Sequence, residues 1–318
     1  MIPRIIHQTW RTADVPPEWS RLAATWRNHH PDWELRLWTD ADNERLVRDH
    51  YPELAAQYAS CPYGIQRADF ARYLILHRHG GVYVDLDMDC LRPVDSLLEG
   101  RTCVLTEEPA IHAAWIGRTR MVSNGFIAAS PGHPFMERVL DLLKVRNLRI
   151  TSHAEVLTST GPVMLGEALA SGNFDVQVLP RGAFSPLTSN DLELIQLHEG
   201  RNVEAIRARC RERGAWAIHY WANTWVRGLA GTLVNPDPDD VPGYVFHPGV
   251  DSPGFDLANA GRDIPQVAAL CDQQMAAVGF NTDGFLKSYI RPRTDWTMAA
   301  YSGPGEGLYV KKAFYFGG

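Results

Sequence analysis

The segment from Tyr63 to Asp89 constrains the fold of this chain most strongly. Residues 63–79 are apolar on most sides of a helix, which predicts a buried helix. Gly80-Gly81 predicts a left-handed cap at its end. Residues 82–89 alternate between apolar and polar, which predicts a strand with one polar face. The polar positions of this strand are Tyr83, Asp85, Asp87 and Asp89.

Three carboxylates on one face of a strand predict a bound cation. Successive residues on one face are about 7 Å apart, and like charges at that spacing repel unless a cation lies among them. An EF-hand loop starting at Asp85 would need Gly and Glu where this chain has Cys90 and Ser96, so that class is excluded.

Three interpretations of the acidic segment remain open at this point. A phosphohydrolase would use Asp85 as nucleophile and Asp87 as acid, but Met88-Asp89 is a poor continuation of that motif. A sugar-nucleotide glycosyltransferase would hold Mn²⁺ or Mg²⁺ between these carboxylates and a diphosphate. The simplest alternative is an acidic turn at the surface.

The preceding helix contains charged residues that bear on the choice. Asp69 and Arg72 are three residues apart and share a face of the helix. Because Gly80-Gly81 turns the chain directly into the acidic strand, that face can lie beside Asp85 and Asp87. A buried ion pair that only fixes the helix is the alternative, although such pairs contribute little net stability.

Two runs of sequence are specific in combination, Arg67-Ala68-Asp69-Phe70-Ala71-Arg72-Tyr73 and Gly80-Gly81-Val82-Tyr83-Val84-Asp85-Leu86-Asp87. They resemble the DXD-containing sugar transferase family (glycosyltransferase family 32-like), which includes fungal initiating mannosyltransferases and α-1,4-galactosyltransferases. Further segments resemble the family in the expected order over about residues 1–230: residues 2–10, 37–40, 124–126, 131–135, 160–162 and 218–225.

Both the alternation of elements and the resemblance predict an α/β fold. The resemblance implies a GT-A-type nucleotide-sugar-binding sandwich with a mostly parallel central sheet. In such sheets ligands bind beyond the carboxyl ends of the strands. We expect strands near 4–8, 34–38, 82–87, 103–107, 125–129, 176–179 and 216–220, and helices near 19–29, 43–49, 52–59, 63–79, 134–145 and 164–170.

The resemblance also implies roles for residues of the helix and the acidic strand. Asp87 would bind Mn²⁺ or Mg²⁺ directly, and Asp85 would contact the donor and reach the metal more loosely. Asp69 and Arg72 would hydrogen-bond hydroxyls of the donor sugar, and Tyr83 would contact the nucleoside. Asp89 lies outside the family pair, and we assign it a supporting or surface role.

The other motifs supply the rest of the predicted donor site. A neutral imidazole is a good ligand for Mn²⁺, which makes His219 the predicted third metal ligand. Trp225 would donate its indole N–H to the β-phosphate. The remaining predicted donor contacts are His7, Gln8 and Trp10 near the base, Asn124 toward the acceptor side, and Asn223 or Thr224 as an oxygen ligand.

The resemblance implies a retaining hexosyltransferase with a UDP- or GDP-sugar donor and a glycan, glycolipid or polysaccharide acceptor. The alternative functions are an aspartyl-nucleophile phosphohydrolase and a non-catalytic carbohydrate-binding protein. Because no second carboxylate is evident as a nucleophile, assistance by the leaving-group oxygen on the same face is the working hypothesis. Glu107 and Glu108, which follow a predicted strand, are the alternative nucleophiles.

Composition excludes several other classes. A net charge of −6 gives no broad basic surface for nucleic acid. No stretch approaches the ~20 apolar residues of a membrane span, and the N-terminus lacks signal-peptide features. The five cysteines are scattered without a CxxC pair. We therefore expect a cytoplasmic enzyme, with peripheral membrane contact left open.

A Pro/Asp-rich linker at residues 235–243 predicts two domains. We assign residues 1–234 to the glycosyltransferase domain and residues 243–314 to a small α+β accessory module. The segments 244–254 and 279–287 resemble PAN/apple-like modules, which usually carry disulfides. Cys271 has no obvious partner nearby, and the module would act in acceptor positioning or as a structural cap.

Overall fold

The structure is a computed structural model in which the chain forms two compact units. Unit 1 comprises Met1–Leu187 and Asn202–Tyr220, and unit 2 comprises Thr188–Arg201 and Trp221–Gly318. The predicted domain boundaries stay predictions. The structure describes residues 1–115, 118–150, 153–188, 191–198, 200–221, 241, 243–290, 295–298 and 306–311.

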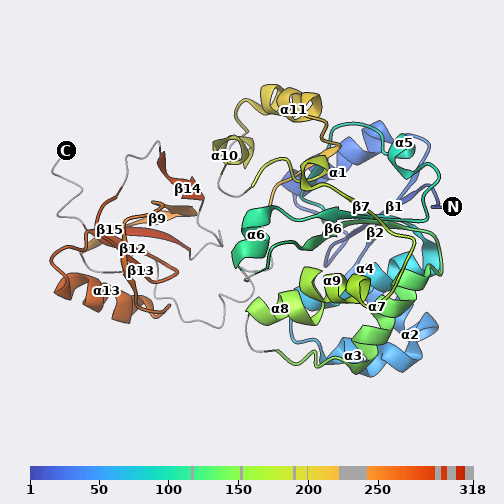
Figure 1. Ribbon diagram of the computed structural model, residues 1–318, viewed down its shortest axis with the longest axis horizontal. Helices are drawn as coiled ribbons and strands as arrows, with labels where there is room; N and C mark the ends of the chain where they lie inside the picture. Colours follow the sequence, from blue (N-terminus) through green and yellow to red (C-terminus); the bar gives the residue numbers. More distant parts are fainter. Residues whose placement is uncertain are drawn as a thin grey trace. The chain divides into compact units, whose positions relative to one another are not determined.

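A six-stranded sheet in the order β2-β1-β3-β6-β5-β7 forms the centre of unit 1 (Figure 1). Parallel pairing joins β1 to β2 and β3, and β5 to β7, whereas β6 runs antiparallel to both neighbours. The sheet is therefore mostly parallel, as predicted. Its strands are β1 (Ile5–Thr9), β2 (Glu34–Trp38), β3 (Gly81–Val84), β5 (Cys103–Glu107), β6 (Val122–Ala129) and β7 (Gln177–Leu179).

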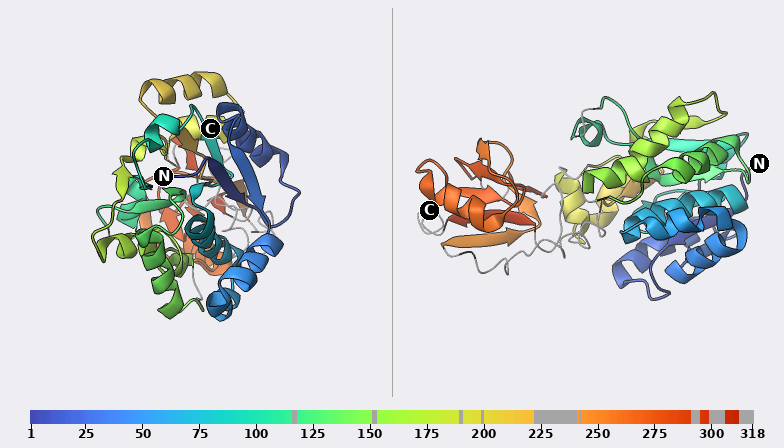
Figure 2. Two further views of the ribbon diagram at one scale, coloured as in Figure 1. Left: turned by 90° about the vertical axis from the view of Figure 1, so that its right-hand side faces the viewer. Right: turned by 90° about the horizontal axis from the view of Figure 1, so that it is seen from below.

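Helices cover both faces of this sheet (Figure 2). The helices α4, α7 and α9 pack together on one face, and α1 lies on the other, where Trp26 is fully buried. The helices of unit 1 are α1 (Pro17–His29), α2 (Asp40–His50), α3 (Ala55–Ser60), α4 (Gly64–His79), α5 (Asp95–Leu98), α6 (Ala110–Trp115), α7 (Pro134–Val145), α8 (His153–Ser159), α9 (Pro162–Ala170) and α11 (Val203–Glu212), with short 3₁₀ turns at Pro52–Leu54 and Arg181–Ala183.

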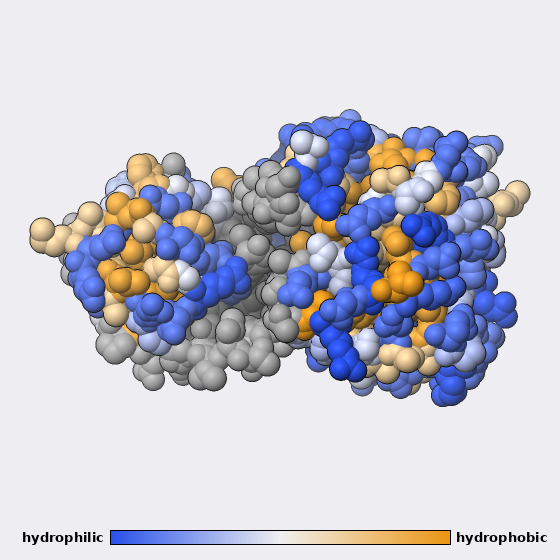
Figure 3. Space-filling model, turned by 60° about the horizontal axis from the view of Figure 1, so that its bottom comes forward, coloured by the Kyte–Doolittle hydropathy of each residue, from blue (hydrophilic) through white to orange (hydrophobic). Residues whose placement is uncertain are grey.

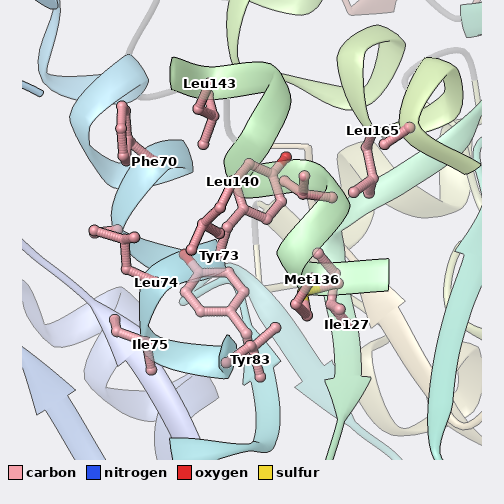
Figure 4. Close-up of a cluster of buried hydrophobic side chains, with 14 of the residues drawn as sticks. Phe70, Tyr73, Leu74, Ile75, Tyr83, Ile127, Met136, Leu140, Leu143 and Leu165 are labelled. Atoms are coloured by element: carbon pink, nitrogen blue, oxygen red, sulfur yellow. The ribbon is translucent and has the colours of Figure 1, made fainter. Parts of the chain in front are cut away.

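Helix α4 is buried as its composition predicts. Figure 4 shows its residues Phe70, Tyr73 and Leu74 in the cluster that also contains Tyr83 of β3 and Leu140 of α7. The helix ends at Gly80, whose φ of 62° and ψ of −159° form a conformation that favours glycine but differs from the left-handed helical cap predicted. A Cβ at Gly80 would lie 2.5 Å from Pro131, so both backbone conformation and space favour glycine there.

The predicted acidic strand is shorter than expected. Strand β3 ends at Val84, and the chain then turns, with Met88 N–H donating to the Asp85 carbonyl at 3.1 Å. Asp89 belongs to a second strand, β4 (Met88–Cys90), which pairs antiparallel with β8 (Ala217–His219). The prediction that Asp85, Asp87 and Asp89 share one face of a strand is therefore wrong, because the turn interrupts the alternation.

An irregularity in the pairing of β5 with β6 lies at the carboxyl edge of the parallel strands. The register shifts between Leu105, opposite Ile127, and Thr106, opposite Ser123. The shift allows Asn124 to reach Asp69 of α4, while the Cα–Cβ direction of Gly125 points to the other side of the sheet. Such bulges turn side chains toward sites at sheet edges.

Unit 2 contains a five-stranded antiparallel sheet in the order β11-β13-β12-β15-β9 and a two-stranded sheet of β10 and β14. Helix α13 packs on the larger sheet through Val267 and Cys271. The described elements are α10 (Leu192–His198), β9 (Tyr244–Pro248), β10 (Val250–Asp251), β11 (Asp256–Asn259), α13 (Ile264–Gln273), β12 (Gly279–Asn281), β13 (Phe285–Lys287), β14 (Thr297–Met298) and β15 (Gly307–Lys311). The resemblance to PAN/apple-like modules stays a prediction.

Candidate metal and donor site

Asp85, Asp87 and His219 come together beyond the end of β3. One ligand atom of each lies within 4.8 Å of the others, and Nε2 of His219 is 3.2 Å from Oδ1 of Asp87. The pairing of Met88 with His219 between β4 and β8 brings the histidine beside the turn. The structure thus assembles the metal-ligand set predicted from the sequence. We call these three residues the donor cluster.

Gly125 of β6 forms the floor of the donor cluster. A Cβ at this position would lie 2.8 Å from Oδ2 of Asp85 and 3.1 Å from Cε1 of His219. The backbone carbonyl of Gly125 also accepts a hydrogen bond of 2.9 Å from Asp85 N–H. Any side chain here would displace the carboxylate or the imidazole, so glycine is required for this close approach.

Behind the donor cluster lies a buried network that involves Asp69 and Arg72. The guanidinium of Arg72 lies 2.9 Å from Oδ1 of Asp69 and 3.5 Å from Oδ1 of Asp85. Asn124 and Thr160 donate to the two Asp69 oxygens at 2.9 Å each. Asp69 and Arg72 are each only 3% exposed. This network orients Asp85 from behind.

Tyr83 links strand β1 to the donor cluster. Its hydroxyl donates to Oδ1 of Asp85 at 3.0 Å and lies 2.9 Å from the Thr9 hydroxyl. The guanidinium of Arg72 lies 4.5 Å from the Tyr83 ring centroid, a cation–π contact. In the structure Tyr83 is fully buried and contacts Asp85, and its predicted nucleoside contact stays a prediction.

Burial and mutual repulsion shape the titration of these groups. Burial raises the pKa of Asp69 to about 6, against the opposing effect of Arg72. Burial also raises the pKa of Asp85, with Arg72 opposing this shift and the neighbouring Asp87 charge adding to it. Burial alone would lower the pKa of His219, but Asp87, Asp85 and Glu108 outweigh it and raise that pKa. A divalent cation would relieve the repulsion between the carboxylates.

The donor set fits a divalent cation. Two carboxylates and one imidazole supply the mixture of oxygen and nitrogen ligands that suits Mn²⁺. The side chains of Asp85 and Asp87 are 26% and 18% exposed, so solvent ions reach them.

Asp89, two residues beyond the pair, has a different environment. It is fully buried, and both of its oxygens accept hydrogen bonds from the Arg207 guanidinium, at 2.7 and 2.8 Å. The surface role considered for Asp89 is wrong, because the ion pair ties β4 to α11. The sequence analysis did not identify Arg207. The amphipathic pattern of residues 203–212 could have predicted the helix on which Arg207 lies.

The predicted base-binding residues of β1 have separate environments. Both ring nitrogens of His7 are engaged within the protein, Nε2 with the Gly80 carbonyl at 2.9 Å and Nδ1 with the Trp38 indole at 3.0 Å. Burial lowers the pKa of His7 to about 4. Gln8 is 5% exposed, and its Nε2 has no hydrogen-bond partner among the described residues. Trp10 is partly exposed beside Arg11.

Three predicted residues lie outside the part of the chain that the structure describes: Asn223, Thr224 and Trp225. Their predicted contacts with the metal and the β-phosphate stay predictions. Within the described ranges, no helix is both long and apolar enough to cross a bilayer.

A mostly parallel α/β sheet with an Asp-x-Asp turn beyond a central strand is the arrangement of GT-A-type glycosyltransferases. Residues 16–104 match the family described as the glycosyltransferase sugar-binding region containing DXD motif. The predicted DXD sugar transferase family is thereby confirmed for this region, which includes Asp69, Arg72, Asp85 and Asp87.

Curated relatives point to the same family. The chain is 40% identical over 172 residues to inositol phosphoceramide mannosyltransferase 3 of Schizosaccharomyces pombe. The aligned segment covers 52% of this chain and 44% of that protein. It is 35% identical to mannosyl phosphorylinositol ceramide synthase CSH1 of Saccharomyces cerevisiae, over 52% of this chain and 42% of that protein. The chain spans about half the length of the curated relatives it matches first.

A longer match links the chain to a viral protein. It is 28% identical to the uncharacterized glycosyltransferase L373 of Acanthamoeba polyphaga mimivirus, over 69% of this chain and 85% of that protein. The solved structure of PaToxG glycosyltransferase aligns with this chain at a TM-score of 0.41 and 18% sequence identity. The alignment covers 53% of this chain and 69% of the PaToxG chain.

Proposed function

We propose that this chain is a metal-dependent, retaining glycosyltransferase that moves a hexose from a UDP- or GDP-sugar to a hydroxyl-bearing acceptor. The observation that carries the proposal is the donor cluster, in which Asp85, Asp87 and His219 place their ligand atoms within 4.8 Å of one another. The cluster lies beyond the carboxyl end of β3, where α/β sheets bind ligands.

The residues of the site have separate tasks in this reaction. A Mn²⁺ or Mg²⁺ ion bound by the donor cluster would neutralise the diphosphate and make it a better leaving group. Asp69, Arg72, Asn124 and Tyr83 hold Asp85 in place through the contacts described above. Donor-sugar hydroxyls would approach from the Asp85 side, because Asp69 and Arg72 are themselves almost completely buried.

The relatives support mannose as the transferred hexose and a glycolipid as the acceptor. Two of them are named for mannosyl transfer to inositol phosphoceramide or its product. Unit 2 exposes large apolar side chains that include Phe255, Leu257 and Tyr289, and Figure 3 shows hydrophobic and hydrophilic residues interspersed on one face. We include peripheral contact with a lipid surface in the proposal.

A cytoplasmic location is also part of the proposal. All five cysteines are buried and are present as thiols rather than disulfides. Free thiols are typical of compartments in which glutathione and thioredoxin keep cysteines reduced.

Calorimetric titration with UDP and GDP, each with and without Mn²⁺, tests the proposal. Binding of one nucleotide that depends on Mn²⁺ and is lost in Asp87→Asn would establish the donor site and identify the donor base. Folded wild-type protein that binds neither nucleotide would contradict it. Incubation with the matching nucleotide mannose, followed by product analysis, then tests the sugar and the anomeric outcome.

A further inference from the structure

Charged and aromatic side chains gather at the carboxyl ends of β1 and β2, outside the donor cluster. Just beyond these strands the two chain segments stay together. Trp10 N–H donates to the Trp38 carbonyl at 3.0 Å, and Asp40 N–H donates to the Arg11 carbonyl at 3.3 Å. The guanidinium of Arg11 lies 5.4 Å from the Trp10 ring centroid. The backbone therefore fixes Trp10, Arg11 and Asp40 beside one another.

Arg67 reaches the same edge of the sheet from the first turn of α4. One of its guanidinium nitrogens donates to the Cys61 carbonyl at 2.8 Å, which restrains the side chain. Partial burial raises the pKa of Asp40, and the charges of Arg67 and Arg11 oppose that shift, so both cations lie near this carboxylate. We call Trp10, Arg11, Asp40 and Arg67 the edge cluster.

The cap of helix α2 leaves the Asp40 carboxylate available. Asp40 is the first residue of α2, but Thr39 and Asp42 form the reciprocal capping box of this helix. Within the described ranges, no hydrogen bond or ion pair joins the Asp40 side chain to another residue, and Asp40 is exposed. Its carboxylate oxygens are therefore open to a ligand.

The separation between the edge cluster and the donor cluster suits a nucleotide. Hydroxyl contacts connect the two along the edge of the sheet, because Thr9 lies 2.9 Å from the Tyr83 hydroxyl, which donates to Asp85 at 3.0 Å. The strand order β2-β1-β3 sets Asp40 two strand spacings from Asp85, about 10 Å across the sheet. An extended nucleoside diphosphate spans a similar distance from its β-phosphate to its base. A diphosphate held at the donor cluster can therefore place its base at the edge cluster.

A carboxylate at this position discriminates among the common bases. An ionised carboxylate only accepts hydrogen bonds, through two adjacent oxygens. Guanine alone among the common bases has two neighbouring donors on its Watson–Crick edge, N1–H and the N2 amino group. Uracil has a single N–H between two carbonyl oxygens, and one of these would face the second carboxylate oxygen. In adenine and cytosine an acceptor ring nitrogen lies next to the amino group. Arginine is a common donor to O6 of guanine, and Arg67 lies beside Asp40.

We propose that Asp40 binds N1–H and the N2 amino group of guanine, with Arg67 donating to O6, and thereby selects a GDP-sugar over a UDP-sugar. The proposal rests on the proposed glycosyltransferase function and deepens it by assigning the residue that reads the donor base. Trp10 supplies a partly exposed aromatic surface on which the base can stack.

Glu44 provides a matched control for Asp40. It is exposed and lies one helical turn further along α2, and its negative charge contributes to the raised pKa of Asp40. Glu44→Gln therefore removes the same charge from the same face of the helix. Inosine diphosphate provides a matched ligand, because it differs from GDP only in lacking the N2 amino group.

Calorimetric titration in the presence of Mn²⁺ measures the affinities of GDP, inosine diphosphate and UDP for wild type, Asp40→Asn and Glu44→Gln. We expect wild type to bind GDP about 10- to 100-fold more tightly than inosine diphosphate, as for one hydrogen bond to a charged group, and UDP more weakly still. Asp40→Asn should weaken GDP binding about 10- to 100-fold and reduce the preference for GDP over inosine diphosphate to within about threefold. Glu44→Gln should match wild type, and Mn²⁺ affinity without nucleotide should be the same in all three proteins.

Several results would overturn the inference and leave the donor site intact. These are Mn²⁺-dependent binding of UDP in preference to GDP, equal affinities of wild type for GDP and inosine diphosphate, an unchanged preference in Asp40→Asn, or the same loss of GDP affinity in Glu44→Gln. Retained Mn²⁺ affinity shows that a variant is folded, and the comparison of the three nucleotides on wild type needs no variant. Absence of Mn²⁺-dependent binding of any of them by wild type would instead refute the proposed function.

Discussion

Each unit of this protein contains a pair of aspartates near a cationic or ionisable side chain, and the two groups differ in what compensates the negative charge. In unit 2, Lys287 places Nζ 3.3 Å from Oδ2 of Asp251 and 2.7 Å from Oδ1 of Asp256, and we call these residues the lysine cluster. In unit 1, the carboxylates of the donor cluster converge with His219.

The lysine cluster carries its own cation. The Lys287 side chain is only 2% exposed, so its ammonium occupies the place that an ion would otherwise fill. In the donor cluster, the guanidinium of Arg72 approaches Asp85 from the buried side, and both carboxylates remain partly open to solvent. The carboxylates of unit 2 are therefore compensated by a cation within the chain, whereas those of the donor cluster remain accessible to a dissolved cation.

Asp87→Ala should have the largest effect of the changes that test this comparison. Loss of a metal ligand should weaken Mn²⁺ affinity at least about 100-fold, more than loss of a group that only supports a ligand. The free energy of unfolding should change little without metal, because the variant removes a repelling charge. Calorimetric Mn²⁺ titration and denaturant unfolding measure the two quantities, and unchanged Mn²⁺ affinity would contradict the assignment.

Lys287→Met should destabilise unit 2 by about 2–3 kcal/mol, because it leaves two carboxylates without their cation. This value lies below the ~3–5 kcal/mol usual for breaking a buried ion pair, because the side chain of Asp256 is 39% exposed. This corresponds to a fall in the melting temperature of unit 2 of roughly 10 °C. Mn²⁺-dependent nucleotide binding should persist.

The control for this change is Arg262→Met, which removes a partly exposed ion pair with Asp283 in the same unit. We expect it to cost less than about 1 kcal/mol. Differential scanning calorimetry compares the two variants. Equal destabilisation by both would show that the lysine cluster has no special role.

Gly125→Ala should weaken Mn²⁺ binding about tenfold by pushing Asp85 and His219 apart. The added Cβ would lie 2.8 Å from Oδ2 of Asp85, closer than real Cβ contacts allow. Gly182→Ala is the matched control, because a Cβ there would have no neighbour within 4 Å. Similar Mn²⁺ affinities in both variants would refute the proposed role of Gly125.

The smallest effect concerns Glu306 of unit 2. Burial, and secondarily the charge of Asp283, raises the pKa of Glu306 from 4.5 to about 8. Between these pH values the folded state holds a proton that the unfolded state has lost, so the free energy of unfolding falls as pH rises. Glu306→Gln should remove this slope. Relative to wild type, the variant should gain about 1 kcal/mol in the free energy of unfolding of unit 2 between pH 5 and pH 8.

Urea unfolding of wild type and Glu306→Gln at several pH values measures the slope. A slope that persists unchanged in the variant would assign it to other groups. The lysine cluster and Glu306 lie in the same unit. Comparing Glu306→Gln with Lys287→Met therefore shows whether ion pairing or protonation of carboxylates contributes more to the stability of that unit.

Local sequence patterns predicted most elements of unit 1. Strands Glu34–Trp38 and Cys103–Glu107 and helix Pro134–Val145 have the predicted bounds, and helix α4 begins one residue later than expected. These elements follow from apolar periodicity and glycine caps, which act over a few residues. The Asp-x-Asp pair and His219 were also identified from residue type and order along the chain.

Long-range pairing decided the rest. The turn after Val84 separates Asp89 from the pair, and Arg207, 118 residues away, then compensates it. The shifted register of β6 sets Asn124 and Gly125 on opposite sides of the sheet. Such contacts depend on the packing of the whole unit rather than on local propensity.

The sequence alone therefore determined most elements of unit 1, the fold class and the set of residues proposed to bind a metal, because periodicity, glycine conformation and ligand chemistry are properties of short segments. Only the tertiary structure decided which carboxylates face solvent and which are paired inside. The reason is that the free energy of a charge depends on its burial and on partners brought from distant parts of the chain.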